Sequence, residues 1–221
     1  MKINSPVKFI LLILILVINS KTIYPQQSKL SKNVNYISEF IASDYFKKLS
    51  KSNNDLALAD TIYLRAVHIT NNDYSETLLA LTFAVVPYKK VPIKIPYFNI
   101  QLYYPLISAD EETFLVKNKN LPAMLYFDSP QNLYGDKDKL AHFFGSAYLT
   151  VSTNLFDFGN LIGYFVEVFE KEFQVQATID IRDMETNSLG NIFGKILKKD
   201  KSILPSQVLI SRTFQYILFT L

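Results

Sequence analysis

The first part of the chain carries apolar stripes with helical spacing, separated by short polar breaks. Two stripes place apolar residues three and four positions apart, as on one face of an α-helix. A break at residues 71–73 leads into a third segment, where Asp73 and Glu76 match a capping box, and this segment stops near Pro87. The stripes consist of Ile37, Phe40, Ile41, Tyr45 and Leu49, and of Leu58, Ala59, Ile62, Ala66 and Ile69. These segments predict three helices that form a small bundle.

Residues 87–133 have a different pattern, with six prolines and strict alternation of apolar residues in two short runs. Alternation is the spacing of β-strands, and proline confines a strand to an edge position. We therefore expect a small two-stranded ribbon, followed by an extended segment over residues 121–130 that ends in a turn. The alternating runs are Ile93, Ile95 and Tyr97, and Ile100, Leu102 and Tyr104.

In the last third of the chain, polar residues recur at helical spacing inside apolar sequence. Asp138 and His142 are four residues apart, and Glu167 and Glu170 are three apart in a predicted helix over residues 160–173. A further predicted helix starts near Ile181 or Arg182 and carries Asp183, Asn187, Gly190 and Gly194 along one line. Buried polar groups are costly unless they satisfy one another or a ligand. The pattern therefore predicts that these polar groups converge.

The two glycines of this last line, Gly190 and Gly194, predict a close approach to a neighbouring helix, because small residues four apart let two backbones touch. The tail from Ile203 to Leu221 is apolar and has Pro205 near its start. It is compatible with a final helix, a strand or contact with a bilayer.

The amino terminus has the pattern of a secretory signal. Lys2 and Lys8 give a positively charged start, residues 9–18 form an unbroken apolar run, and the sequence then turns polar at Asn19 and Ser20. Such a run is short for a membrane span, which needs about 20 apolar residues. We expect export to the periplasm or the outer cell envelope, with cleavage after Ser20; the alternative is an uncleaved amino-terminal anchor. Residues 21–33 are polar and predict a flexible lead-in.

Composition excludes several classes of function. The chain has no cysteine, which excludes disulfides, thiolate metal sites and a lipid-modified amino-terminal cysteine. Its formal charge of +3 falls to +1 without Lys2 and Lys8, and no basic stripe indicates nucleic acid as a partner. Local lysine clusters near residues 89–94 and 195–199 predict solvated faces or contact with acidic lipid headgroups.

The candidate chemistry is that of imidazole and carboxylates, which suits a divalent metal or a proton relay. Asp138, His142, Glu167 and Asp183 are the candidate metal ligands, and His142 and Glu167 are the candidate catalytic groups. The simpler alternative makes Asp138 a helix cap bonded to a partly buried His142. Glu170 and Asn187 are expected in a structural polar network with these residues. No HExxH, GxSxG or glycine-rich phosphate loop is present.

Residues 135–197 resemble the VanZ-like group of membrane-associated proteins and a related family of uncharacterised, lipoprotein-like bacterial envelope proteins. The resemblance rests on three ordered motifs: DKLAHF at 138–143, GYFVEVFE at 163–170 and DMETNSLGNIFG at 183–194. It implies a helical core with a shared polar site, and it assigns no reaction. Unlike VanZ-like proteins, this chain has no apolar stretch near the 20 residues of a membrane span in that region. Its apolar segments over residues 141–156 and 158–169 are shorter and are interrupted by polar residues.

Together these patterns predict a mainly α protein, a helical bundle with a small β-ribbon insertion and a VanZ-like helical core in the carboxy-terminal half. The expected division is residues 1–20, 21–33, 34–133 and 134–221. Two functions remain open. The first is an exported cell-envelope protein, non-enzymatic or membrane-apposed, that contacts a membrane surface or envelope components. The second is a metal-dependent hydrolase that acts on lipid-linked or cell-wall substrates.

Overall fold

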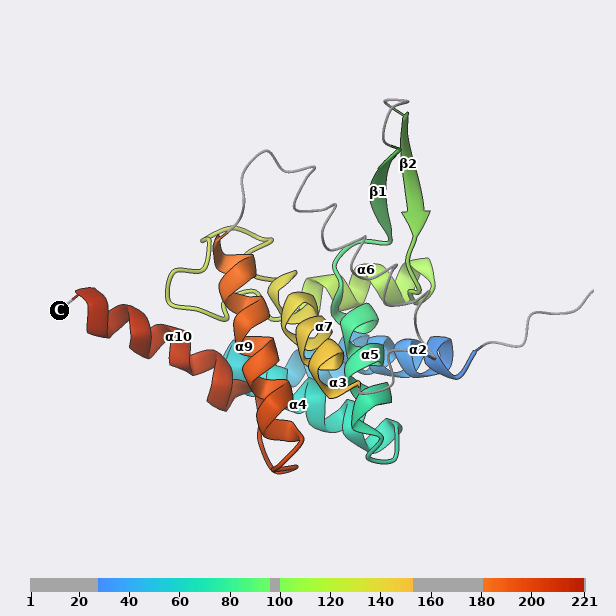
Figure 1. The fold of residues 1–221 in the computed structure, drawn as a ribbon. Coiled ribbons are helices and arrows are strands. Elements are labelled where there is room, and N and C mark those ends of the chain that lie inside the picture. Colours follow the sequence, from blue (N-terminus) through green and yellow to red (C-terminus); the bar gives the residue numbers. More distant parts are fainter. Residues whose placement is uncertain (1–27, 96–99, 153–180, 221) are drawn as a thin grey trace, which may run out of the picture.

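The protein is described by a computed structural model that covers residues 28–95, 100–152 and 181–220. These residues form a mainly helical body with one antiparallel ribbon (Figure 1), which confirms the predicted fold class. The elements are α2 (Lys29–Ala42), α3 (Asp44–Leu49), α4 (Asp55–Ile69), α5 (Tyr74–Val85), β1 (Lys90–Ile95), β2 (Ile100–Pro105), α6 (Glu111–Asn120), α7 (Lys139–Val151), α9 (Ile181–Leu197) and α10 (Pro205–Thr220).

The polar breaks of the sequence become helix caps. The side chains of Asn54 and Asp73 accept hydrogen bonds from the backbone N–H groups three residues later, and so begin α4 and α5. Ser43 does the same for α3, and its extended backbone breaks the single helix expected over residues 34–49 into α2 and α3. The lead-in is shorter than expected, because Ser28 caps α2 and the helix begins at Lys29.

The ribbon has the predicted strands, with Val91 opposite Tyr104 and Ile93 opposite Leu102. The ribbon is followed by a helix that the sequence analysis did not predict. Residues 111–120 form α6, which the proline-rich composition of the region concealed, and Asp110 caps it by accepting from the N–H of Thr113.

The core forms around α5, whose residues from Thr77 to Val85 are all buried. Helices α2, α4 and α7 pack against it. The most extensive helix pair is α7 and α9, and Gly190 and Gly194 make it possible. A Cβ atom at Gly190 would collide with the carbonyl oxygen of Phe143, and one at Gly194 would lie 2.8 Å from that of Ala147. The predicted close approach is therefore confirmed.

The apolar tail forms α10, which packs on α4 and α9 through buried Val208 and Leu209. Its carboxy-terminal half extends away from the body, where Phe214 and Leu218 are exposed (Figure 1). Among the described helices, none combines the length and the apolar character needed to cross a membrane.

Candidate functional site

The candidate site lies where the amino-terminal ends of α7 and α9 meet. The two helices run parallel, as the order of their contacts shows: positions rise together along both helices. The pairs are Lys139 with Asp183, Ser146 with Asn187, and Thr150 with Asn191. This arrangement brings the polar positions of both helices to the same end of the pair. The sequence motifs at residues 138–142 and 183–187 thus form one cluster.

Asp138, His142 and Asp183 are brought together as the sequence predicted. Each offers one oxygen or nitrogen atom that could bind a metal, and these three atoms lie within 4.8 Å of one another. His142 is buried, and its Nε2 lies 3.7 Å from Oδ1 of Asp183. His142 thus has carboxylates on both sides, Asp138 one turn back on α7 and Asp183 across the helix pair.

In the simpler alternative Asp138 caps α7, and Asp138 does occupy the N-cap position of this helix. The Asp138 side chain makes no capping hydrogen bond. Its Oδ2 instead lies 3.2 Å from the ammonium nitrogen of Lys139. The Asp138 carboxylate is therefore held within the polar cluster. The first turn of α7 is closed by backbone hydrogen bonds instead, such as the one from the N–H of His142 to the carbonyl oxygen of Asp138.

Lys139 is the functional residue that the sequence interpretation missed. Its side chain is only 4% exposed, and its ammonium pairs with both Asp138 and Asp183. The signal was present in the DKLAHF motif, where a lysine interrupts an otherwise apolar helix start. Because the ammonium contacts two of the three candidate ligands, it supplies positive charge to the carboxylates that a metal would otherwise bind.

A second ionic group lies beside the first. Asp136 is fully buried and accepts hydrogen bonds from Arg182 and from Ser129. Arg182 immediately precedes Asp183, so the first turn of α9 contributes to both groups. Together they tie the loop before α7 to the start of α9.

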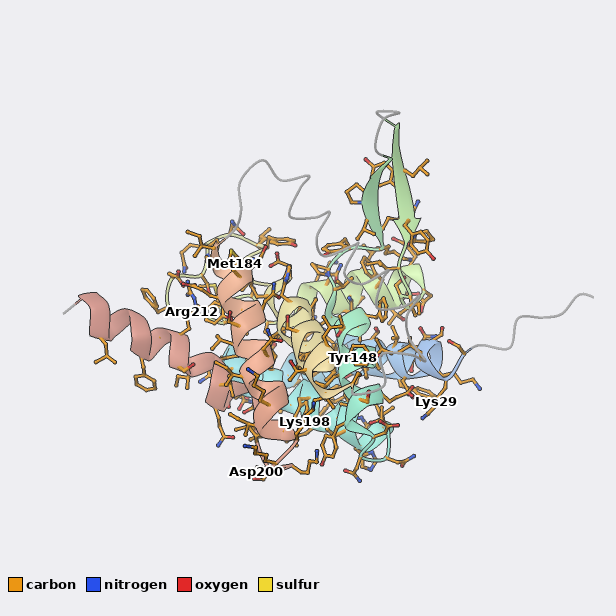
Figure 2. The ribbon with its side chains drawn as sticks, viewed as in Figure 1. Lys29, Tyr148, Met184, Lys198, Asp200 and Arg212 are labelled. Carbon is orange, nitrogen blue, oxygen red and sulfur yellow. The ribbon has the colours of Figure 1, made fainter. Side chains whose placement is uncertain are left out.

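Arg212 of α10 completes this end of the molecule (Figure 2). Its guanidinium pairs with both oxygens of Asp128, contacts Glu185 at 2.7 Å and lies 4.5 Å from the ring centre of Tyr126. The hydrogen bonds from Arg212 lower the pKa of Asp128. Burial raises the pKa of Tyr126 to about 12, so its hydroxyl stays protonated beside Thr186 at ordinary pH.

Polar contacts continue along the α7–α9 seam. The Ser146 hydroxyl donates to Oδ1 of Asn187 at 3.0 Å, and the Thr150 hydroxyl donates to Oδ1 of Asn191 at 2.9 Å. Asn187 therefore joins the two helices. The other candidates, Glu167 and Glu170, lie outside the described residues, and His68 is exposed on α4.

Comparisons with protein-family models, with curated proteins and with solved structures find no match for this chain.

Proposed function

We propose that this chain is an exported, non-enzymatic cell-envelope protein that lies against a membrane surface. In this proposal the cluster of Asp138, Lys139, His142 and Asp183 is a structural network that joins α7 to α9. The observation that carries it is the buried ammonium of Lys139 between two carboxylates. The secretory pattern of residues 1–20 and the resemblance of residues 135–197 to VanZ-like envelope proteins support the location.

The charge arrangement favours a structural role. Removing a charge from water is costly, and a buried ion is retained only where partners compensate it. Lys139 provides that compensation for Asp138 and Asp183 from within the chain. A divalent cation at the same oxygens would have to displace the ammonium, and the buried ammonium would then lose the carboxylates that compensate its charge.

The second candidate is a metal-dependent hydrolase that acts on lipid-linked or cell-wall substrates. One observation favours it: a histidine and two carboxylates offer three atoms within 4.8 Å of one another. In that case Asp138, His142 and Asp183 would hold the metal, whose chemistry is to lower the pKa of a bound water. His142 and Glu167 remain the catalytic candidates of this alternative.

The two histidines of the chain provide a matched experiment. His142→Ala and His68→Ala remove the same group from a buried and from an exposed position. The structural proposal predicts that His142→Ala lowers the free energy of unfolding by about 1–3 kcal/mol, because it leaves buried polar neighbours unsatisfied, whereas His68→Ala changes it little. A stable His142→Ala protein that has lost a hydrolase activity present in the parent would support the second candidate instead.

A further inference from the structure

The ribbon formed by β1 and β2 extends away from the helical body (Figure 1). At its base Val91 is buried, whereas the residue opposite it in the ribbon, Tyr104, is half exposed. Leu102 and Tyr103 are more exposed still. A two-stranded ribbon has little stability in water on its own and usually packs against another surface. Its exposed apolar residues therefore indicate a contact surface.

The strands themselves argue against a partner that adds a further strand. Strand addition uses an unbroken row of backbone donors and acceptors at a sheet edge. β1 contains Pro92 and β2 ends at Pro105, and proline has no N–H to donate. Contact through side chains is favoured over contact through the backbone.

The charge of this region matches an anionic surface. No aspartate or glutamate occurs between residues 77 and 109, whereas Lys89, Lys90 and Lys94 all do. Lys90 is exposed, and Lys89 pairs with Glu111 of α6 at the base of the ribbon. Tyrosine and leucine beside lysine are typical of segments at a lipid interface, where the ring lies among the headgroups and the ammonium pairs with phosphate.

We infer that the ribbon docks edge-on on an anionic lipid surface. By the strand register Leu102 and Tyr104 lie on one face of the ribbon, and Tyr103 and Lys90 lie on the other. Side chains of both faces then reach the headgroup region, where Lys90 lies against the lipid phosphates. The inference rests on the proposed function, to which it adds the segment that touches the membrane. It is independent of the α7–α9 cluster, which lies on other elements of the fold.

The test is sedimentation with vesicles of phosphatidylcholine and phosphatidylglycerol, using the chain from Lys21 onward. Removing residues 1–20 excludes binding by the apolar leader, and far-ultraviolet circular dichroism of the shortened parent checks that it is folded. The variant is Leu102→Ser with Tyr103→Ser. Its matched control is Leu64→Ser with Tyr45→Ser, because the two leucines are both 52% exposed and the two tyrosines are 64% and 63% exposed.

We expect the parent and the control to bind these vesicles, and the ribbon variant to bind at least about tenfold more weakly. Lys90→Gln should weaken binding about fivefold, and vesicles of phosphatidylcholine alone should bind less than the mixed vesicles. Equal binding by the ribbon variant and the parent overturns the inference while it leaves a membrane-apposed protein intact. No binding by the parent overturns both. A ribbon variant that loses self-association, with no lipid binding by the parent, assigns the surface to a second copy of the chain and overturns the lipid inference.

Discussion

Replacing Lys139 with methionine tests the ionic cluster most severely. Lys139→Met keeps the length of the side chain and removes only the ammonium that pairs with Asp138 and Asp183. The two carboxylates would then face each other without their shared cation. Removing one partner of a buried ion pair costs about 3–5 kcal/mol. The side chains of Asp138 and Asp183 are 20% and 12% exposed, so water screens them in part, and we expect a loss near the lower limit, about 3 kcal/mol.

The assay is urea unfolding followed by helical circular dichroism, with Lys137→Met as the control. Lys137 lies in the loop just before α7, is partly exposed and has no ion pair among the described contacts. Its replacement should change the free energy of unfolding by less than about 0.5 kcal/mol. Combining Lys139→Met with Asp183→Asn removes one of the two negative charges that repel each other, and it should restore part of the lost stability. A Lys139→Met protein as stable as the parent, or a double variant without any recovery, would refute the argument.

Three further predictions concern the contact between α7 and α9, the buried Lys117 and the binding of zinc. Gly190→Ala should lower the free energy of unfolding by about 1–3 kcal/mol in urea unfolding, and Gly194→Ala should lower it by less. The reason is that a Cβ at position 190 meets the carbonyl oxygen of Phe143 more closely than a Cβ at position 194 meets that of Ala147. Equal stability of the parent and Gly190→Ala would contradict the close approach. Burial lowers the pKa of Lys117 from 10.5 to about 7, so between those pH values the unfolded chain binds a proton that the folded chain lacks. Stability should therefore rise with pH across this window in the parent and rise less in Lys117→Met, and parallel pH curves for the two proteins would be inconsistent with this burial. Zinc should raise the melting temperature of Lys139→Met more than that of the parent. The variant leaves the three ligand atoms of Asp138, His142 and Asp183 without the competing ammonium. An equal rise in both proteins would show that Lys139 does not compete with zinc for these atoms.

The local elements of this fold could be predicted because their signals are local. Asn54 and Asp73 mark helix starts through hydrogen bonds to residues three positions away, and the alternation of residues 100–104 specifies a strand. Gly190 and Gly194 predicted a helix contact because few other roles explain two glycines four apart inside a helix. Helix α6 was missed because its apolar residues are few and the surrounding prolines dominate the pattern.

The membership of the polar cluster was predicted in part, since Asp138, His142 and Asp183 do meet. Lys139 was missed because a lysine next to an aspartate is usually solvated, and its burial depends on where α9 packs. The same holds for Arg182 and Arg212, two of the three arginines in the chain, which bind aspartates 46 and 84 positions away in sequence. Pairings over such separations depend on the tertiary fold, which a pattern within a single segment does not contain.

In the structural proposal, Lys139 neutralises the carboxylates of the cluster in place of a metal. The most direct measurement is elemental analysis of the purified protein beside its His142→Ala variant. Our account predicts no divalent metal near one equivalent per chain in either protein. A metal close to one equivalent in the parent that is lost from a folded His142→Ala variant would contradict the account and make the cluster a metal centre.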